Sequence, residues 1–100
     1  MPIMQISVIP LGTGSPSVSK YVADIIKVLK KEEGIKCELT AMSTIIESNS
    51  LDRLFEVAKR IHRVPFDNGA LRVLTLINID DRRDKELSIK GKLKSVRKKL

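Results

Sequence analysis

Two helix-periodic apolar stretches are the feature that most constrains how this chain can fold. The first runs from about Ser17 to Glu33 and the second from about Leu51 to Val64. In each, apolar residues recur at the i, i+3, i+4 and i+7 spacing of a single helical stripe. We therefore expect two amphipathic helices that bury one face each against a shared layer.

Four strand-like segments surround these helices and define the fold class. They are short, rich in β-branched residues and bounded by turn residues: Ile3–Pro10, Ile35–Ala41, Met42–Glu47 and Leu71–Ile79. The resulting order, βαββαβ, is that of the ferredoxin-like split βαβ motif, an α+β two-layer sandwich. Right-handed crossovers predict an antiparallel sheet of strand order 4-1-3-2 with both helices on one face.

The pattern of the last strand also predicts that the chain forms an oligomer. Val73, Ile77 and Ile79 are expected to point one way, whereas Leu71 and Leu76 lie among the residues pointing the other way. A strand that is apolar on both sides predicts that both faces of the sheet are covered. A second copy of the chain is the simplest cover, so we expect a sheet-to-sheet homo-oligomer.

The positive charge is confined to the C-terminal end. Residues 1–81 hold ten Lys/Arg and ten Asp/Glu, whereas residues 82–100 hold nine basic and two acidic residues. A basic helix is expected from about Leu87, and the spacing of Leu93, Val96 and Leu100 favours a helix that docks on the protein or its neighbour. Contact with nucleic acid or anionic lipid is the alternative, although no aromatic residue is present there to stack on bases.

Length and composition predict one cytoplasmic domain over residues 1–100. The first residues lack a signal-peptide pattern, and no apolar run reaches the roughly 20 residues that span a bilayer. Cys37 is the only cysteine, so neither an internal disulfide nor a cysteine zinc site can form, and the reducing cytoplasm is the expected compartment.

No residue pattern indicates catalysis. His62 is the only histidine, and it is expected to pack at the edge of its helix, whereas Cys37 is expected to be a buried or half-buried structural thiol. The loop Leu11–Ser15 matches no phosphate-binding motif and is expected to be a flexible turn. We therefore expect a binding protein, with no catalytic residue, no metal and no cofactor.

Polar residues on an otherwise apolar sheet face form the candidate site. Ser43 and Glu47 share the face opposite Thr44, and Gln5 and Ser7 interrupt the first strand in the same way. Burying such groups unpaired costs about 1–3 kcal/mol, so they need partners. Two interpretations remain open: they bond one another or a second subunit, or they line a small polar pocket at the subunit boundary in which a carboxylate faces a cationic ligand.

Four segments in order resemble the thiamine-binding protein family, which is related to the YkoF-like proteins. They are Ser7–Thr13, Ser17–Val22, Thr44–Glu47 and Asn78–Asp84, and they span nearly the whole chain. The resemblance implies a ferredoxin-like fold, a tetramer built as a dimer of dimers, and cytoplasmic binding of thiamine or its hydroxymethylpyrimidine moiety without catalysis. Nucleic acid and membranes are not expected partners.

Carried over residue by residue, the resemblance implies a ligand site made of Ser7, Thr44, Glu47, Ser43, Tyr21 and Arg72. Glu47 and the hydroxyls would pair with the pyrimidine, and Tyr21 offers an aromatic edge to the thiazolium cation. Thr44 and Glu47 point to opposite faces of an ideal strand. Both can therefore contribute to one ligand site only if the end of the strand twists or two subunits meet there. Ser48 stands where the family commonly has glycine.

Two other functions compete with this hypothesis. A nucleic-acid-binding or regulatory protein acting through the basic tail predicts strongly salt-dependent binding that disappears when residues 90–100 are deleted. An enzyme acting on a thiamine-related metabolite would need a nucleophile or metal site that the sequence does not offer.

Overall fold

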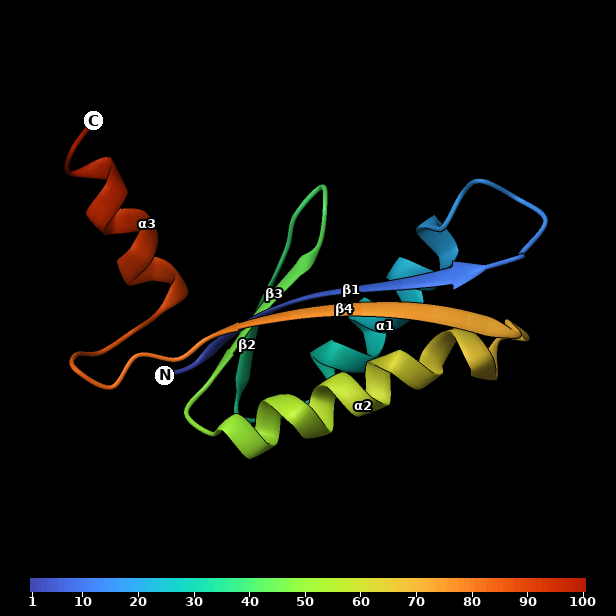
Figure 1. Cartoon of the computed structure of the whole chain (residues 1–100), viewed down its shortest axis with the longest axis horizontal. Helices are drawn as coiled ribbons and strands as arrows, with labels where there is room; N and C mark the ends of the chain where they lie inside the picture. Colours follow the sequence, from blue (N-terminus) through green and yellow to red (C-terminus); the bar gives the residue numbers. More distant parts are fainter.

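The structure, a computed structural model, describes residues 1–100. Its seven elements are β1 (Ile3–Leu11), α1 (Ser19–Lys30), β2 (Ile35–Leu39), β3 (Thr44–Ser48), α2 (Leu51–Asp67), β4 (Arg72–Asp80) and α3 (Ile89–Arg97). The first six follow the predicted βαββαβ order. Figure 1 shows α1 and α2 along one side of the sheet, whereas α3 stands apart at the end of the molecule where the N-terminus lies.

The strand order is β2-β3-β1-β4, which confirms the predicted topology. The chain's first and last strands are neighbours: β1 pairs with β4 along its whole length, from Ile3 opposite Asp80 to Leu11 opposite Arg72. On its other side, β1 pairs with β3 only over Ile3–Ile6. The second half of β1 therefore has a strand on one side only.

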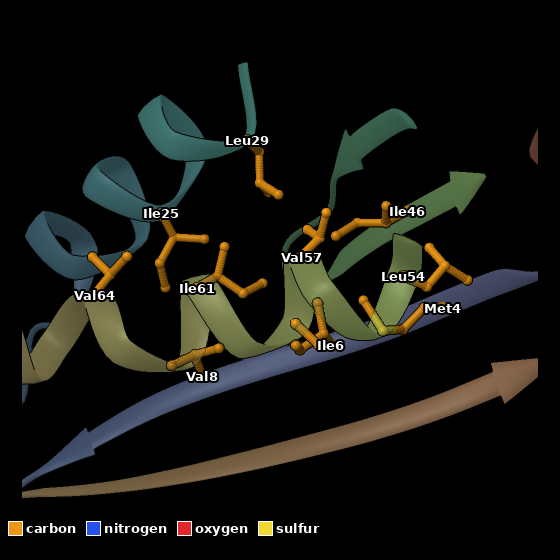
Figure 2. Packing of buried hydrophobic residues seen from close by; sticks show 11 residues of the cluster. Met4, Ile6, Val8, Ile25, Leu29, Ile46, Leu54, Val57, Ile61 and Val64 are labelled. Atoms are coloured by element: carbon orange, nitrogen blue, oxygen red, sulfur yellow. The ribbon is translucent and has the colours of Figure 1, made fainter. Parts of the chain in front are cut away.

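The hydrophobic core lies between the sheet and the first two helices. Alternate residues of each strand point to opposite faces, and in the central strands β1 and β3 those facing the helices are buried. Figure 2 shows the side chains of β1, β3, α1 and α2 converging in this layer. The eleven-residue cluster consists of Met4, Ile6, Val8, Ile25, Leu29, Ile46, Leu54, Val57, Ala58, Ile61 and Val64. We call this side of the sheet the inner face and the opposite side the outer face.

Both helices differ from their predicted limits. Helix α1 is shorter at both ends than the predicted range from Ser17 to Glu33, and its N-cap is Val18, which makes no side-chain capping bond. Helix α2 begins as predicted, with Ser50 accepting a hydrogen bond from the Arg53 N–H at 3.2 Å. It continues two residues beyond Pro65, because a proline in the last turn removes only one intrahelical bond.

A half-buried carboxylate joins the two helices. Glu32, just after α1, accepts a hydrogen bond from Arg53 of α2 at 2.5 Å. It accepts another from Arg60, about two turns further along the same helix. The hydrogen bond from Arg60, supported by Arg53, holds the pKa of Glu32 below its usual range despite the opposing effect of burial.

Three expectations about individual side chains are wrong. Cys37 is exposed, because β2 is the edge strand beyond the reach of the helices. Phe55 is an apolar residue of the second predicted helix and was expected on its buried stripe, but it is half exposed. Leu71 precedes β4 and is almost fully exposed, so Leu74 and Leu76 are the apolar residues of β4 on the outer face.

The outer face is only partly covered. Helix α3 has no buried residue, and it lies over one end of this face. The radius of gyration is 14.6 Å, larger than the roughly 13 Å typical of a compact chain of this length, because α3 projects from the two-layer body (Figure 1).

Candidate functional site

A hollow of about 390 Å³ opens on the outer face beneath α3. All four strands and α3 contribute to it, so it forms only when the sheet is complete. Its walls combine isoleucines and a leucine with amides and charged groups: Ile3, Gln5, Glu38, Ile45, Asn78, Ile79, Asp80, Ile89, Lys92 and Leu93. We call this feature the α3 hollow.

Two amides of its floor, Asn78 and Gln5, form a hydrogen-bonded row that continues to Ser43 outside the hollow. Asn78 of β4 donates from Nδ2 to Gln5 Oε1 of β1 at 3.0 Å. Gln5 in turn donates from Nε2 to Ser43 Oγ, before β3, at 3.1 Å. The row follows from the register, which places Gln5 directly between Asn78 and Ile45. Asn78 lines the hollow, and its Oδ1 accepts no hydrogen bond from the protein.

Glu47 lies beside the hollow and holds α3 in place. Its side chain is 4% exposed, and its Oε2 accepts a hydrogen bond from the Ile89 N–H, the first of α3, at 2.7 Å. Its Oε1 lies 3.8 Å from Lys36 Nζ. A carboxylate at a helix N-terminus satisfies a free N–H group and opposes the positive end of the helix dipole.

The local sequence before α3 fits this placement. Ser88 caps the helix by accepting from the Gly91 N–H at 2.9 Å, and Leu87 is buried. A Cβ on Gly91 would lie 2.9 Å from Ser88 Oγ, so a glycine suits this cap. One turn further on, Lys92 Nζ bonds Asp80 Oδ2 of β4 at 2.6 Å. Together these contacts attach α3 to the sheet at two points.

Charges of both signs border the hollow. Glu38, Asp80 and Glu47 carry carboxylates, and Lys36 and Lys92 are the cations near them. Each lysine pairs with Glu47 or Asp80, which leaves the exposed carboxylate of Glu38 without an ion-pair partner. The hollow is therefore apolar on its walls, amide-lined on its floor, and bordered by one free carboxylate.

A second, smaller hollow of about 230 Å³ lies at the unpaired half of β1, between α1 and the β2–β3 hairpin. It brings together Ser7, Ser43 and Thr44 among mostly apolar side chains. The Ser7 hydroxyl donates to the Met42 carbonyl at 3.4 Å, which ties the hairpin turn to β1.

The six residues implied by the resemblance therefore fall into separate places. Ser7, Ser43 and Thr44 line the smaller hollow, and Glu47 borders the α3 hollow. Thr44 points to the inner face and Glu47 to the outer one, as strand alternation predicts. Within one chain, the fold does not bring Tyr21 of α1 to Glu47, and Arg72 lies about 26 Å along β4 from Asp80.

Asn78, Glu38 and Asp80 are residues of the hollow that sequence reasoning did not place in a site. Asn78 was visible as the one amide in an apolar strand, on the same side as Leu74 and Leu76. The predicted strand order would have placed it beside Gln5 once the β1–β4 register was assumed. No sequence signal distinguishes Glu38 from an ordinary exposed edge residue.

The chemistry that this arrangement offers is recognition. Amide donors and acceptors fix the orientation of a heteroaromatic ring, apolar walls bury it, and a carboxylate attracts a cation.

His62, the only histidine, lies outside the hollow. It forms a hydrogen bond with Thr75 Oγ1 at 2.6 Å and packs edge-on against Phe66. His, Cys, Asp and Glu side chains nowhere form a group of three that could hold a metal ion. None of the three helices has the length and apolar character that crossing a bilayer requires.

Fold and hollow together define a small α+β protein with four antiparallel strands and an open, partly polar sheet face. Comparison with known proteins identifies its family. Residues 4–97 match the family described as thiamine-binding protein, and the chain belongs to that family.

Relatives in distant organisms share the whole chain. The UPF0045 protein YqgV of Bacillus subtilis (strain 168) is 50% identical over 103 residues, covering 100% of this chain and 98% of the relative. The crystal structure of the protein MJ1052 from Methanocaldococcus jannaschii superposes with a TM-score of 0.84 at 39% identity, over 95% of this chain and 94% of that one.

A more distant structure shows the same fold. A Thermotoga maritima protein, described as a candidate thiamine biosynthesis/salvage protein, gives a TM-score of 0.75 at 17% identity. The superposition covers 95% of this chain and 97% of that protein.

Proposed function

We propose that this protein binds thiamine, or its hydroxymethylpyrimidine moiety, in the α3 hollow and does not turn it over. The observation that carries the proposal is the hydrogen-bonded amide pair of Asn78 and Gln5, which lines the hollow together with the unpaired carboxylate of Glu38 and apolar side chains. A chain of the thiamine-binding protein family with these groups on one open face has the recognition chemistry that the vitamin requires.

The pyrimidine ring matches the amide floor. An aminopyrimidine presents an amino donor next to a ring-nitrogen acceptor. Asn78 Oδ1, which accepts no hydrogen bond from the protein, would accept from the amino group. Ile3, Ile45 and Leu93 would cover the ring faces.

The thiazolium ring matches the acidic border. It carries a fixed positive charge and no N–H group, so it is attracted by a nearby carboxylate rather than by a hydrogen-bond acceptor of fixed geometry. Glu38 is the carboxylate that no lysine or arginine neutralises. The hydroxymethylpyrimidine moiety lacks this cation, and we therefore expect Glu38 to favour thiamine over the moiety alone.

A second subunit would complete the site. Leu74 and Leu76 leave an apolar strip on the outer face, next to the hollow, that α3 does not reach. Packing of two outer faces would bury this strip and close the open side of the hollow. Ser7 and Arg72, which lie away from Glu47 within one chain, could approach a neighbour's hollow in such an assembly.

The contacts of α3 favour this function over nucleic-acid binding through the tail. Lys92 is paired with Asp80, and Leu93 lines the hollow, so the first turns of the basic helix are part of the site. A tail that bound nucleic acid would need Lys92 free for a phosphate, although the other basic residues of α3 form no ion pair.

Thermal unfolding in the presence of ligands tests the proposal. Thiamine at about 100 times its dissociation constant should stabilise the protein by about 2.7 kcal/mol, and hydroxymethylpyrimidine should also stabilise it. Asn78→Ala should weaken both ligands, because both use the amide row. Glu38→Gln should weaken thiamine alone, because only thiamine carries the thiazolium charge. Choline, an unrelated cation, should have no effect.

Glu33→Gln is the matched control, since Glu33 is an exposed glutamate that does not line the hollow. It should leave both shifts unchanged. If the ligands still stabilise the Asn78→Ala protein, the binding site lies elsewhere, and the smaller hollow with Thr44 is the next place to test. No stabilisation by either ligand would contradict the proposed function.

A further inference from the structure

Helix α3 is held to the body of the protein more weakly than the other two helices. Helices α1 and α2 bury two and six residues, whereas α3 buries none and stands apart in Figure 1. Every residue from Lys90 to Leu100 is exposed, and none belongs to the core cluster. Segments with few buried apolar contacts open locally while the rest of a protein stays folded. Helix α3 is therefore the element that we expect to detach first.

Only the beginning of α3 is fastened to the sheet. Leu87 is buried just before the helix, and the Ile89 N–H donates to the Glu47 carboxylate. The other attachment, from Lys92 to Asp80, joins two side chains that are each about half exposed, and such pairs add little stability. The connector from β4 to α3 contains no helix or strand. Rotation of the connector near Leu87 would therefore detach α3 without disturbing the sheet.

The sequence of α3 does not stabilise a helix by itself. The helix has nine residues, and isolated helices shorter than about 12–15 residues are marginal in water. Gly91 lies in its first turn, and glycine disfavours a helix. Residues 89–100 contain six Lys or Arg and no Asp or Glu, so no ion pair within the helix supports it. The helix therefore depends on its contact with the sheet.

That contact is made across the α3 hollow. Ile89 and Leu93 lie one turn apart on the same side of α3, and both line the hollow. Leu93 is nevertheless 42% exposed, so the sheet covers only part of it. A ligand in the hollow would contact Leu93 while the helix is docked and would lose this contact when the helix detaches. A ligand whose contacts differ in this way favours the docked state.

We propose that α3 is a strap over the hollow, detached in part of the ligand-free protein and held on the sheet when the hollow is occupied. The strap moves about Leu87, and the bond between the Ile89 N–H and Glu47 closes it. By linkage, the ligand favours docking of α3 by the same factor by which docking strengthens ligand binding. Occupancy of the hollow thereby controls whether the apolar side of a basic helix is exposed. Naming thiamine as the occupant rests on the proposed function, whereas the looseness of the strap does not.

Hydrogen exchange of the ligand-free protein tests whether α3 detaches. The amides of residues 93–97, which are bonded within α3, should exchange at least about tenfold faster than the buried amides of α2. Low concentrations of urea should quicken the slowest amides of α2 but leave the α3 rates almost unchanged, because detachment exposes little surface. Glu47→Ala should quicken exchange in α3 further and leave α2 unaffected.

Thiamine tests the coupling between the hollow and the strap. At about 100 times its dissociation constant, thiamine should slow the exchange of residues 93–97 by at least about tenfold, and choline should not slow it. Leu93→Ala should lower the affinity for thiamine by about tenfold, because it removes the side chain that covers the ligand. Val96→Ala is the matched control. Val96 is an apolar residue of the same helix that is 59% exposed and does not line the hollow, so the affinity should stay the same.

Two results would overturn the proposal. If the amides of α3 are as well protected as those of α2 in the ligand-free protein, the helix is fixed and is not a strap. If thiamine raises the melting temperature but leaves exchange in α3 unchanged, the hollow and the helix are not coupled. A protein that neither thiamine nor hydroxymethylpyrimidine stabilises contradicts the proposed function, and thiamine as the occupant fails with it. Exchange in the ligand-free protein still decides in that case whether α3 detaches.

Discussion

The two faces of one sheet have different physical tasks in this protein. On the inner face, Met4 and Ile6 of β1 are buried under two helices and belong to the apolar core cluster. On the outer face, one residue further along in each case, Gln5 and Ser7 make polar contacts. The same strand thus packs into the hydrophobic core on one side and presents polar groups on the other. We expect substitutions on the inner face to change mainly stability, and those on the outer face to change mainly binding.

The largest effect should come from the inner face. Ile61→Ala removes a fully buried side chain of α2 and should lower the free energy of unfolding by about 2–5 kcal/mol, through lost burial and the cavity left behind. Leu74→Ala on the outer face, measured by urea denaturation in the same way at low protein concentration, should cost less than half as much. Equal costs would contradict the division between the faces.

An intermediate effect is expected where the outer face is buried. Glu47→Ala leaves the Ile89 N–H without its acceptor and should lower the free energy of unfolding by about 1–3 kcal/mol. Hydrogen exchange should quicken at the start of α3 but not in α2. Glu47→Gln, which keeps an acceptor oxygen, should lose less. If hydrogen exchange quickens in α2 as much as in α3, then Glu47 stabilises the whole fold and not just α3.

Acid should loosen the contact between the helices of the inner layer. Because its arginine partners hold the folded-state pKa of Glu32 below the unfolded value, the ion pairs contribute their full stability above an unfolded pKa of about 4.3. This contribution declines as the pH falls toward the folded-state pKa and is absent below it. Glu32→Gln should flatten that part of the stability–pH curve. Glu33→Gln, an exposed neighbour, should leave the curve unchanged.

The smallest effect should come from the exposed ion pair over the hollow. Lys92 and Asp80 are each about half exposed, so Lys92→Ala should change the free energy of unfolding by no more than about 1 kcal/mol. Thiamine binding should be equal or stronger, because the variant removes a cation from the hollow. A large loss of stability would mean that α3 depends on Lys92 more than on Glu47.

Strand and helix order could be predicted because they depend on periodicity, which is a local property. The alternation in Ile3–Pro10 and the helical stripe after Leu51 each indicate one element, and right-handed crossovers then leave one strand order. Cys37 was misplaced because alternation tells which face a residue shares, not whether a helix covers that face. Its strand lies at the edge, beyond α1 and α2.

The site was predicted less completely because it depends on register and on α3. Gln5 and Glu47 were recognisable as polar residues in apolar strands. The contact between Glu47 and the Ile89 N–H joins positions 42 residues apart, and no local pattern specifies it. The family resemblance indicated Thr44 and Glu47 together, and the strand places them on opposite faces.

The neighbouring positions of the first and last strands have a consequence for how the chain is made. β1 is among the first segments to be synthesised, yet Ile3 pairs with Asp80, 77 residues later. The central ladder is therefore almost entirely non-local, which predicts folding slower than that of a helical protein of equal size. Until β4 is synthesised, one full edge of an apolar strand remains unpaired, so a nascent chain of this protein should be most prone to aggregate just before residue 80 becomes available.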